Sequence, residues 1–157
     1  MSASRDSKIR LLVVDDHFFV RMGLTGSLNT EPDIRVVAEA DNGKKAFELY
    51  RKHCPDVVLL DGLLPDGSGE KTLNILRGEF PEARVLMLLN DDWEEDGFRA
   101  MRSGAAGHLP KTAQLPELLQ AIRAIHAGKR YHPSLIAMPK QSAVKVQVLN
   151  QSQGEVA

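Results

Sequence analysis

The stretch that decides the fold is IRLLVVDD, residues 9–16, in which an apolar run ends directly at two aspartates. A second run, VVLL at residues 57–60, ends in the same way at Asp61. Short aliphatic runs with few polar residues are typical of strands that are buried on both faces of a parallel sheet. In open α/β sheets, ligands bind beyond the carboxyl ends of the strands, where the strand order switches. If the two strands are neighbours, Asp15, Asp16 and Asp61 therefore meet in one pocket.

Three carboxylates in one pocket repel one another unless a positive charge lies between them. A divalent cation with oxygen ligands would remove this repulsion, and Mg²⁺ fits such a ligand set. The residues therefore predict a Mg²⁺ site that includes Asp15, Asp16 and Asp61.

The composition is that of one compact cytoplasmic domain. The chain has 157 residues, of which 26% are charged, and its formal net charge is -1. This balance gives no general attraction to nucleic acid or to an anionic membrane. The single cysteine, Cys54, cannot form an internal disulfide, which points to a reducing compartment. No apolar run approaches the roughly 20 residues that span a bilayer, and residues 1–7 lack the apolar stretch of a secretion signal.

Predicted strands alternate with predicted helices along the chain, which favours βαβ units and a parallel sheet. The expected strands are residues 9–14, 34–40, 57–60, 84–89 and 108–109, and the expected helices are residues 18–28, 44–53, 70–79, 93–103 and 115–127. The fold class predicted from this order is a five-stranded, doubly wound, flavodoxin-like parallel sheet with five helices.

The C-terminal part of the chain differs in composition from the residues before it. We expect a domain over residues 8–130 and a tail over residues 131–157, which holds two prolines and four glutamines. The tail is interpreted as a flexible extension. A short edge strand at residues 144–148 is the alternative, because three valines alternate there with polar residues.

Residues 8–130 resemble the receiver domain of the response regulators of two-component signalling. The resemblance rests on the acidic pair Asp15-Asp16, on Asp61, and on the turn LPDGSG at residues 64–69. It also rests on Lys111, which follows the segment GAAG at residues 104–107. The DDH and GAAGHLPK segments are most similar to the subfamily whose receivers precede a helix-turn-helix output domain.

The resemblance implies a role for each site residue. Asp61 would be the phosphoacceptor, attacking a phosphohistidine of a sensor histidine kinase or a phosphotransfer protein. Asp15 and Asp16 would hold Mg²⁺ together with Asp61 and the backbone carbonyl of Leu63. Lys111 would place a positive charge beside Asp61 and, after transfer, beside the phosphoryl group.

Three residues depart from the family pattern. Leu89 stands where the family has a Thr or Ser whose hydroxyl contacts the phosphoryl group, and leucine has no donor. Asn90 stands where a small residue is usual. His108 replaces the switch aromatic, Tyr or Phe, and is interpreted either as a movable switch residue or as a half-exposed strand residue. Phosphorylation is therefore expected, while its conformational readout stays open.

Direct DNA binding is not expected, because fewer than 30 residues follow Gly128 and they resemble no output domain. The expected output is protein–protein contact, homodimerisation included, through a face with Trp93, Phe98, Met101 and His108.

The sequence allows two alternatives to a phosphorylatable receiver. The first is a pseudo-receiver, which has the same fold but binds a partner independently of phosphorylation. The second is an enzyme, such as a haloacid-dehalogenase-like phosphatase. That family has an Asp-x-Asp pattern after the first strand, and Asp15-Asp16-His17 does not fit it. The chain is therefore predicted not to be an enzyme.

Overall fold

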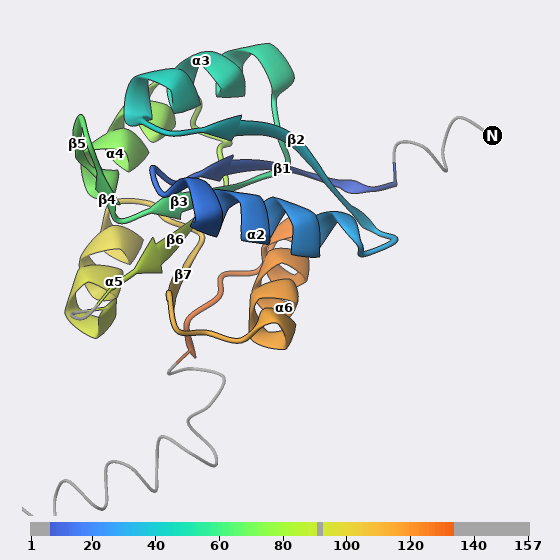
Figure 1. Cartoon of the computed structure of the whole chain (residues 1–157). Helices are drawn as coiled ribbons and strands as arrows, with labels where there is room; N and C mark the ends of the chain where they lie inside the picture. Colours follow the sequence, from blue (N-terminus) through green and yellow to red (C-terminus); the bar gives the residue numbers. More distant parts are fainter. Residues whose placement is uncertain (1–6, 91–92, 134–157) are drawn as a thin grey trace, which may run out of the picture.

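The computed structural model describes residues 7–90 and 93–133 (Figure 1). The main sheet is built from β1 (Ile9–Val14), β2 (Ile34–Ala40), β3 (Val57–Asp61), β6 (Val85–Leu89) and β7 (Gly107–Pro110). All neighbours are parallel, in the order β2-β1-β3-β6-β7. The predicted five-stranded doubly wound sheet is confirmed, and the predicted strand ends differ from the observed ones by a residue at most.

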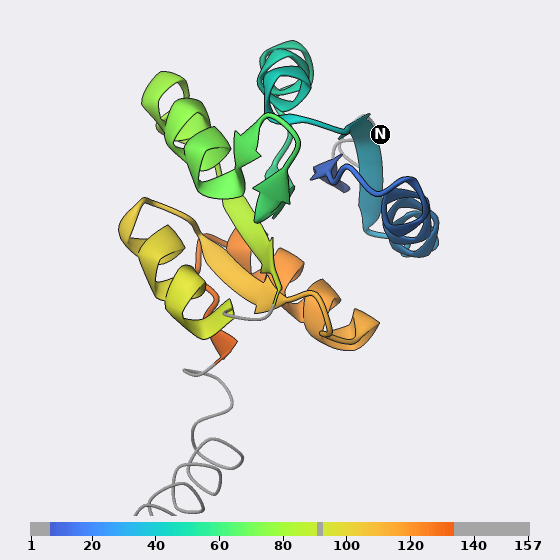
Figure 2. The same ribbon diagram turned by 60° about the vertical axis from the view of Figure 1, so that its left-hand side comes forward.

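Helices cover both faces of the sheet (Figure 2). On one face lie α2 (Phe18–Asn29) and α6 (Leu115–His126). On the other lie α3 (Gly43–His53), α4 (Gly69–Glu79) and α5 (Trp93–Arg102). The molecule is thus a three-layer α/β domain with five helices, as the alternating pattern predicts.

Each face of the sheet has its own apolar core, and the same strands supply both. In β1, Leu11 and Val13 belong to the core beneath α2 and α6, whereas Leu12 and Val14 belong to the core beneath α3, α4 and α5. This division follows from strand geometry, because successive side chains point to opposite faces. It explains why the central strands β3 and β6 contain no polar residue before their last position.

The switch in strand order places the acidic residues together. The chain leaves β1 for β2 on one side and returns to β3 on the other side of β1. Val14 is in register with Leu60, and these residues directly precede Asp15 and Asp61. Since parallel strands end at the same edge of a sheet, Asp15 and Asp61 emerge side by side.

A short hairpin follows β3 and fills the segment that the sequence predicts as a turn. It pairs β4 (Leu63–Leu64) with β5 (Gly67–Ser68) in antiparallel register. The hairpin returns the chain to Gly69, whose backbone N–H donates to the carbonyl of Gly62 at 2.9 Å. A Cβ atom at Gly69 would overlap the carbonyl oxygen of Asp61, so only glycine permits this close approach.

The described part of the chain continues past the predicted domain end at residue 130. Tyr131 forms a bridge with Gly107, donates its N–H to Ala106 at 2.9 Å, and is only 2% exposed. His132 is also buried. The prediction from the sequence places both residues in the tail, but in the structure they pack against the domain. The edge strand considered for residues 144–148 lies outside the described residues. None of the described helices has the length and apolar character needed to cross a membrane.

Candidate functional site

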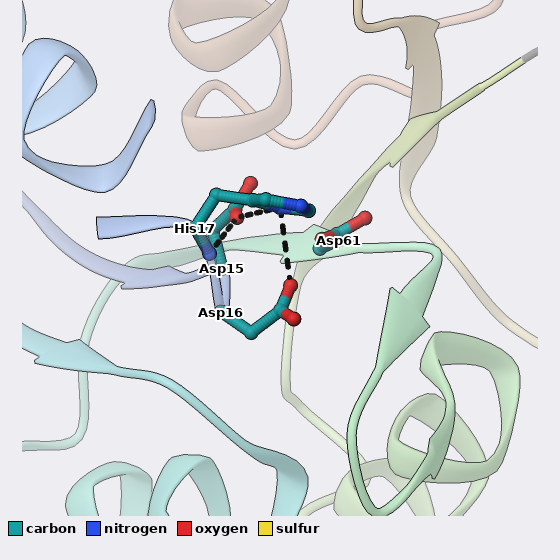
Figure 3. Close-up of side chains that lie close together, drawn as sticks. All are labelled: Asp15, Asp16, His17 and Asp61. Atoms are coloured by element: carbon teal, nitrogen blue, oxygen red, sulfur yellow. Dashed lines mark hydrogen bonds and ion pairs between the residues drawn. The ribbon is translucent and has the colours of Figure 1, made fainter. Parts of the chain in front are cut away.

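Four potential ligand groups converge at the carboxyl ends of β1 and β3. Asp15, Asp16 and His17 follow β1, and Asp61 is the last residue of β3. One ligand atom from each residue can be chosen so that all of them lie within 4.8 Å of one another. Figure 3 shows the three side chains after β1 gathered beside Asp61, which belongs to the neighbouring strand. The structure therefore brings together the three carboxylates named from the sequence.

Lys111 completes this cluster from the end of β7. Its Nζ atom lies 2.9 Å from Oδ1 of Asp61 and 3.2 Å from Oδ2 of Asp15. Its backbone N–H donates to the carbonyl of Leu89 at 2.7 Å, which fixes the chain at this point. One ammonium thus links the carboxylates of two neighbouring strands.

Burial and nearby charges have opposite effects on the pKa values of Asp61 and Lys111. Burial raises the pKa of Asp61 above its ordinary value, while hydrogen bonds from Lys111 and from the N–H of Leu63 oppose the rise. Burial alone would lower the pKa of Lys111. The hydrogen bond to Asp61 and the charges of Asp61 and Asp15 outweigh that effect, so the pKa of Lys111 lies above its ordinary value. Lys111 therefore stays a cation at neutral pH.

The charges and contacts of the cluster fit a divalent cation. Asp15 and Asp61 are each 1% exposed and share a single ammonium, that of Lys111, while Asp16 adds a third carboxylate to the cluster. Oδ2 of Asp61 is buried and accepts no hydrogen bond from any described residue. A buried carboxylate oxygen without a partner is costly, and a bound cation would satisfy it.

Leu63 lies next to the cluster, but its predicted ligand atom is not tested by any contact. Its backbone N–H donates to Oδ1 of Asp61 at 3.2 Å, and its side chain is exposed. Coordination by its carbonyl oxygen stays a prediction.

His17 is a member of the cluster that sequence reasoning did not single out. Its Nδ1 atom lies 3.2 Å from Oδ1 of Asp15 and 3.2 Å from Oδ1 of Asp16. Its backbone N–H also donates to Oδ1 of Asp15 at 2.8 Å. Its position directly after the acidic pair Asp15-Asp16 is the sequence feature that could have indicated this role.

Leu89 and Asn90 lie at the end of β6, beside the end of β3. Leu89 is buried in the core beneath α3, α4 and α5. Its Cδ2 atom lies only 2.7 Å from the place where a Cβ atom on Gly62 would be. Asn90 is exposed. An apolar side chain therefore occupies the space directly after Asp61.

His108 is completely buried, which overturns its interpretation as a half-exposed strand residue. Its ring packs edge-on against His132 with a centroid distance of 4.4 Å, and Phe98 lies 6.5 Å away. His108 consequently cannot belong to the exposed contact face predicted from the sequence. Phe98 is 51% exposed and Met101 is half-buried, while the side chain of Trp93 lies outside the described residues.

Comparisons with known proteins agree with this geometry. Residues 11–123 match the family described as the response regulator receiver domain. Over 140 residues the chain is 43% identical to the response regulator GacA of Pseudomonas aeruginosa, an alignment that covers 87% of this chain and 63% of GacA. The chain thus spans somewhat less than two thirds of that relative's length.

Two solved structures are similar over most of the chain. One is a two-component response regulator of the LuxR family from Aurantimonas sp. SI85-9A1, with 34% identity and a TM-score of 0.79, covering 89% of this chain and 99% of that one. The other is the signal receiver domain of the putative response regulator NarL from Mycobacterium tuberculosis, with 34% identity, a TM-score of 0.74, and coverage of 78% and 99%.

Receiver domains are signalling modules rather than enzymes, and they bind Mg²⁺ at an acidic pocket of the kind described above. The fold, the position of the acidic cluster at the switch in strand order, and the match over residues 11–123 lead to one conclusion. This chain belongs to the response regulator receiver domain family of two-component signalling.

Proposed function

We propose that this receiver accepts a phosphoryl group on Asp61 from a sensor histidine kinase or a phosphotransfer protein, with Mg²⁺ as cofactor, in the cytoplasm. The observation that carries the proposal is the state of the Asp61 carboxylate. One of its oxygens is held by Lys111 at 2.9 Å, and the other is buried without a hydrogen-bond partner among the described residues. The second oxygen is free to bind the cation, and the carboxylate acts as nucleophile through the oxygen that the cation does not hold.

The transfer exchanges one bond for another. A carboxylate oxygen of Asp61 forms a bond to phosphorus, the phosphorus–nitrogen bond of the phosphohistidine breaks, and the released imidazole nitrogen takes a proton from solvent. Asp61 becomes an acyl phosphate. Lys111 first orients the carboxylate and then offsets the negative charge of the phosphoryl oxygens.

Asp15, Asp16 and Asp61 would hold the Mg²⁺, with the carbonyl of Leu63 as a further ligand. When bound, the ion supplies positive charge to the phosphoryl oxygens during transfer. The buried carboxylate of Asp15 is already oriented for this task by Lys111 at Oδ2 and by the backbone N–H of His17 at Oδ1.

The test is phosphorylation by acetyl phosphate in the presence of Mg²⁺, followed by intact mass. We expect the wild-type chain to gain the mass of one phosphoryl group and Asp61→Asn to gain none. Asp96→Asn is the matched control, because Asp96 lies on α5 and pairs with Arg99 outside the cluster. Phosphate uptake by folded Asp61→Asn would refute the assignment of the nucleophile.

A second candidate function is a pseudo-receiver that binds its partner without phosphorylation. Leu89 favours it, because a buried apolar side chain stands beside Gly62 where a hydroxyl would contact the phosphoryl group. The pair of buried Asp61 and half-buried Lys111 opposes it, since charged groups removed from water with no task are costly to keep. Absence of phosphate uptake and of Mg²⁺ binding in the folded wild-type chain would favour the pseudo-receiver.

Output through protein contact remains the proposal for this chain, with a homodimer as one such contact. Phe98 on α5 is exposed and can take part in it, but His108 cannot, because it is buried. Direct DNA binding by the described domain is not proposed, since the formal net charge of the chain is -1.

A further inference from the structure

The imidazole of His17 shares the pocket with the three carboxylates, and receivers that bind Mg²⁺ through oxygen atoms do not need it. We propose that Nδ1 of His17 is a direct ligand of the metal bound at this site. We further propose that the site therefore binds divalent transition metals such as Co²⁺ and Ni²⁺ more tightly than Mg²⁺. This inference rests on the metal site of the proposed function and concerns which ions that site prefers.

The position of the His17 ring carries the first step. Nδ1 lies 3.2 Å from an oxygen of Asp15 and 3.2 Å from an oxygen of Asp16. Figure 3 shows the ring lying across these two carboxylates and directed toward Asp61. The nitrogen thus faces the same space as the carboxylate oxygens.

The backbone holds His17 in this position. His17 is the N-cap residue of α2, with extended dihedral angles (φ -84°, ψ 111°), and its side chain makes no capping hydrogen bond. Its backbone N–H is instead bonded to Oδ1 of Asp15 at 2.8 Å. The side chain is 65% exposed, so no packing prevents the small rotation that coordination requires.

Lys111 and His17 face different oxygens of Asp15. Lys111 contacts Oδ2 of Asp15 and Oδ1 of Asp61, whereas His17 contacts Oδ1 of Asp15. The buried Oδ2 of Asp61 has no hydrogen-bond partner among the described residues. A cation bound by His17, Oδ1 of Asp15 and Oδ2 of Asp61 would therefore leave both Lys111 contacts in place.

The distances between the ligand atoms suit a divalent metal ion once these atoms move slightly closer together. Metal–ligand distances of about 2.1 Å place opposite ligand atoms roughly 4.2 Å apart. The four ligand groups lie within 4.8 Å of one another. Side-chain rotation at the two exposed residues, Asp16 and His17, is sufficient to close this difference.

Ligand chemistry then determines the preference. Carboxylates and carbonyls suit Mg²⁺, whereas imidazole suits the later first-row metals, for which affinity rises from Mn²⁺ to Cu²⁺. Mg²⁺ also keeps several of its waters and gains little from a nitrogen ligand. A site with three carboxylates and one imidazole should therefore favour Co²⁺ and Ni²⁺ over Mg²⁺.

The experiment compares the affinities of the full chain and its variants for Mg²⁺ and Co²⁺ by calorimetric titration, and records the visible absorption of bound Co²⁺. The test variant is His17→Asn, because asparagine is a good N-cap residue and should preserve the start of α2. We expect wild type to bind Co²⁺ at least about tenfold more tightly than Mg²⁺. In His17→Asn, the affinity for Co²⁺ should fall about tenfold or more, whereas the affinity for Mg²⁺ should change less than about twofold. The visible absorption of bound Co²⁺ should also shift, because a nitrogen atom has left the ligand set.

His126→Asn is the matched control, since His126 is exposed on α6 and contacts no residue of the cluster. It should behave as wild type. Equal losses of Mg²⁺ and Co²⁺ affinity in His17→Asn would show that His17 only positions the carboxylates. Unchanged Co²⁺ affinity and absorption would show that it is no ligand at all. Either result overturns the proposal.

Asp61→Asn separates this inference from the proposed function. If Asp61→Asn binds Mg²⁺ as wild type does, the metal site itself is misassigned. If Asp61→Asn loses both ions while His17→Asn keeps both, the metal site stands and only the role of His17 is wrong.

A second measurement needs no variant. The imidazole protons of His17 should show large paramagnetic shifts in the NMR spectrum of the Co²⁺-loaded wild-type chain. Shifts limited to other histidines would contradict the proposal.

Discussion

His108 is fully buried, and this burial opposes its protonation. The pKa of His108 is lowered to about 4, first by burial and then by repulsion from His132. Burial also lowers the pKa of His132. A residue type that normally titrates near neutrality therefore stays neutral in the folded domain.

This leads to a prediction about the pH dependence of stability. The unfolded chain binds a proton at His108 near pH 6.5, whereas the folded chain does so only near pH 4. The folded state thus binds fewer protons between these values, and the free energy of unfolding should fall as the pH is lowered from 6.5 to 4. The contribution of His108 amounts to about 3 kcal/mol.

Urea denaturation at several pH values checks this prediction. In His108→Phe the loss of stability between pH 6.5 and 4 should be clearly smaller than in wild type. His126→Gln, which changes an exposed histidine, should keep the wild-type dependence. An equal pH dependence in wild type and His108→Phe would contradict the prediction.

Leu89 offers a second prediction at the scale of one side chain. Leu89→Thr places a hydroxyl at the end of β6, beside the end of β3. A hydrogen bond to a charged group contributes about 1.5–3 kcal/mol, so the affinity for the phosphoryl mimic beryllofluoride should rise roughly tenfold. The same change removes buried apolar volume and should lower the free energy of unfolding by about 2 kcal/mol.

Leu89→Val is the matched control, because valine has the shape of threonine without the hydroxyl. It should show the loss of stability but not the gain in affinity. If Leu89→Thr and Leu89→Val bind beryllofluoride equally well in a fluorescence or calorimetric titration, no phosphoryl contact is available at this position.

At the scale of elements, the contact between α5 and β7 depends on Gly97. A Cβ atom at Gly97 would overlap the ring of His108, so α5 can lie this close to β7 only with glycine here. No pattern in the sequence indicates this contact, because a glycine inside a helix is usually interpreted only as lowering helix stability.

Gly97→Ala should therefore lower the free energy of unfolding by about 1–3 kcal/mol through overpacking. Gly23→Ala is the matched control, since no atom lies within 4 Å of the added methyl group in α2. That change should instead raise stability by about 0.5–1 kcal/mol. Thermal melts of the two variants measure both effects, and a stabilised Gly97→Ala would show that His108 leaves its place easily.

At the scale of the whole molecule, the C-terminal segment helps to close the domain. Tyr131 bridges to Gly107 at the edge of the sheet and belongs to the core beneath α2 and α6. His132 follows it and covers His108. These two residues join the end of the described chain to the last strand.

Tyr131→Ala should accordingly lower the free energy of unfolding by about 3–5 kcal/mol, as is usual for a buried aromatic residue. Tyr131→Phe, which keeps the ring, should cost much less. Chemical denaturation of the full chain gives both values. Equal stability of Tyr131→Ala and wild type would show that the domain ends before this residue, as the sequence alone suggested.

The fold and the meeting of the three aspartates were predictable from the sequence. The strands β1 and β3 are largely apolar runs that end directly at carboxylates, so strand order alone brings Asp15 and Asp61 to one edge. These features depend on local pattern and on the rules of parallel sheets, and both can be read along the chain.

Only the tertiary structure decided where several residues outside the aspartate cluster lie and what they contact. Gly97 and Tyr131 carry no local pattern that reveals their contacts, because their partners belong to other elements. His17 directly follows the acidic pair, but the position of its ring depends on the angle at which α2 begins. The burial of His108 likewise depends on α5 and on His132, which comes 24 positions later in the chain. Side-chain burial is a property of what packs on a strand, and the strand's own sequence does not contain it.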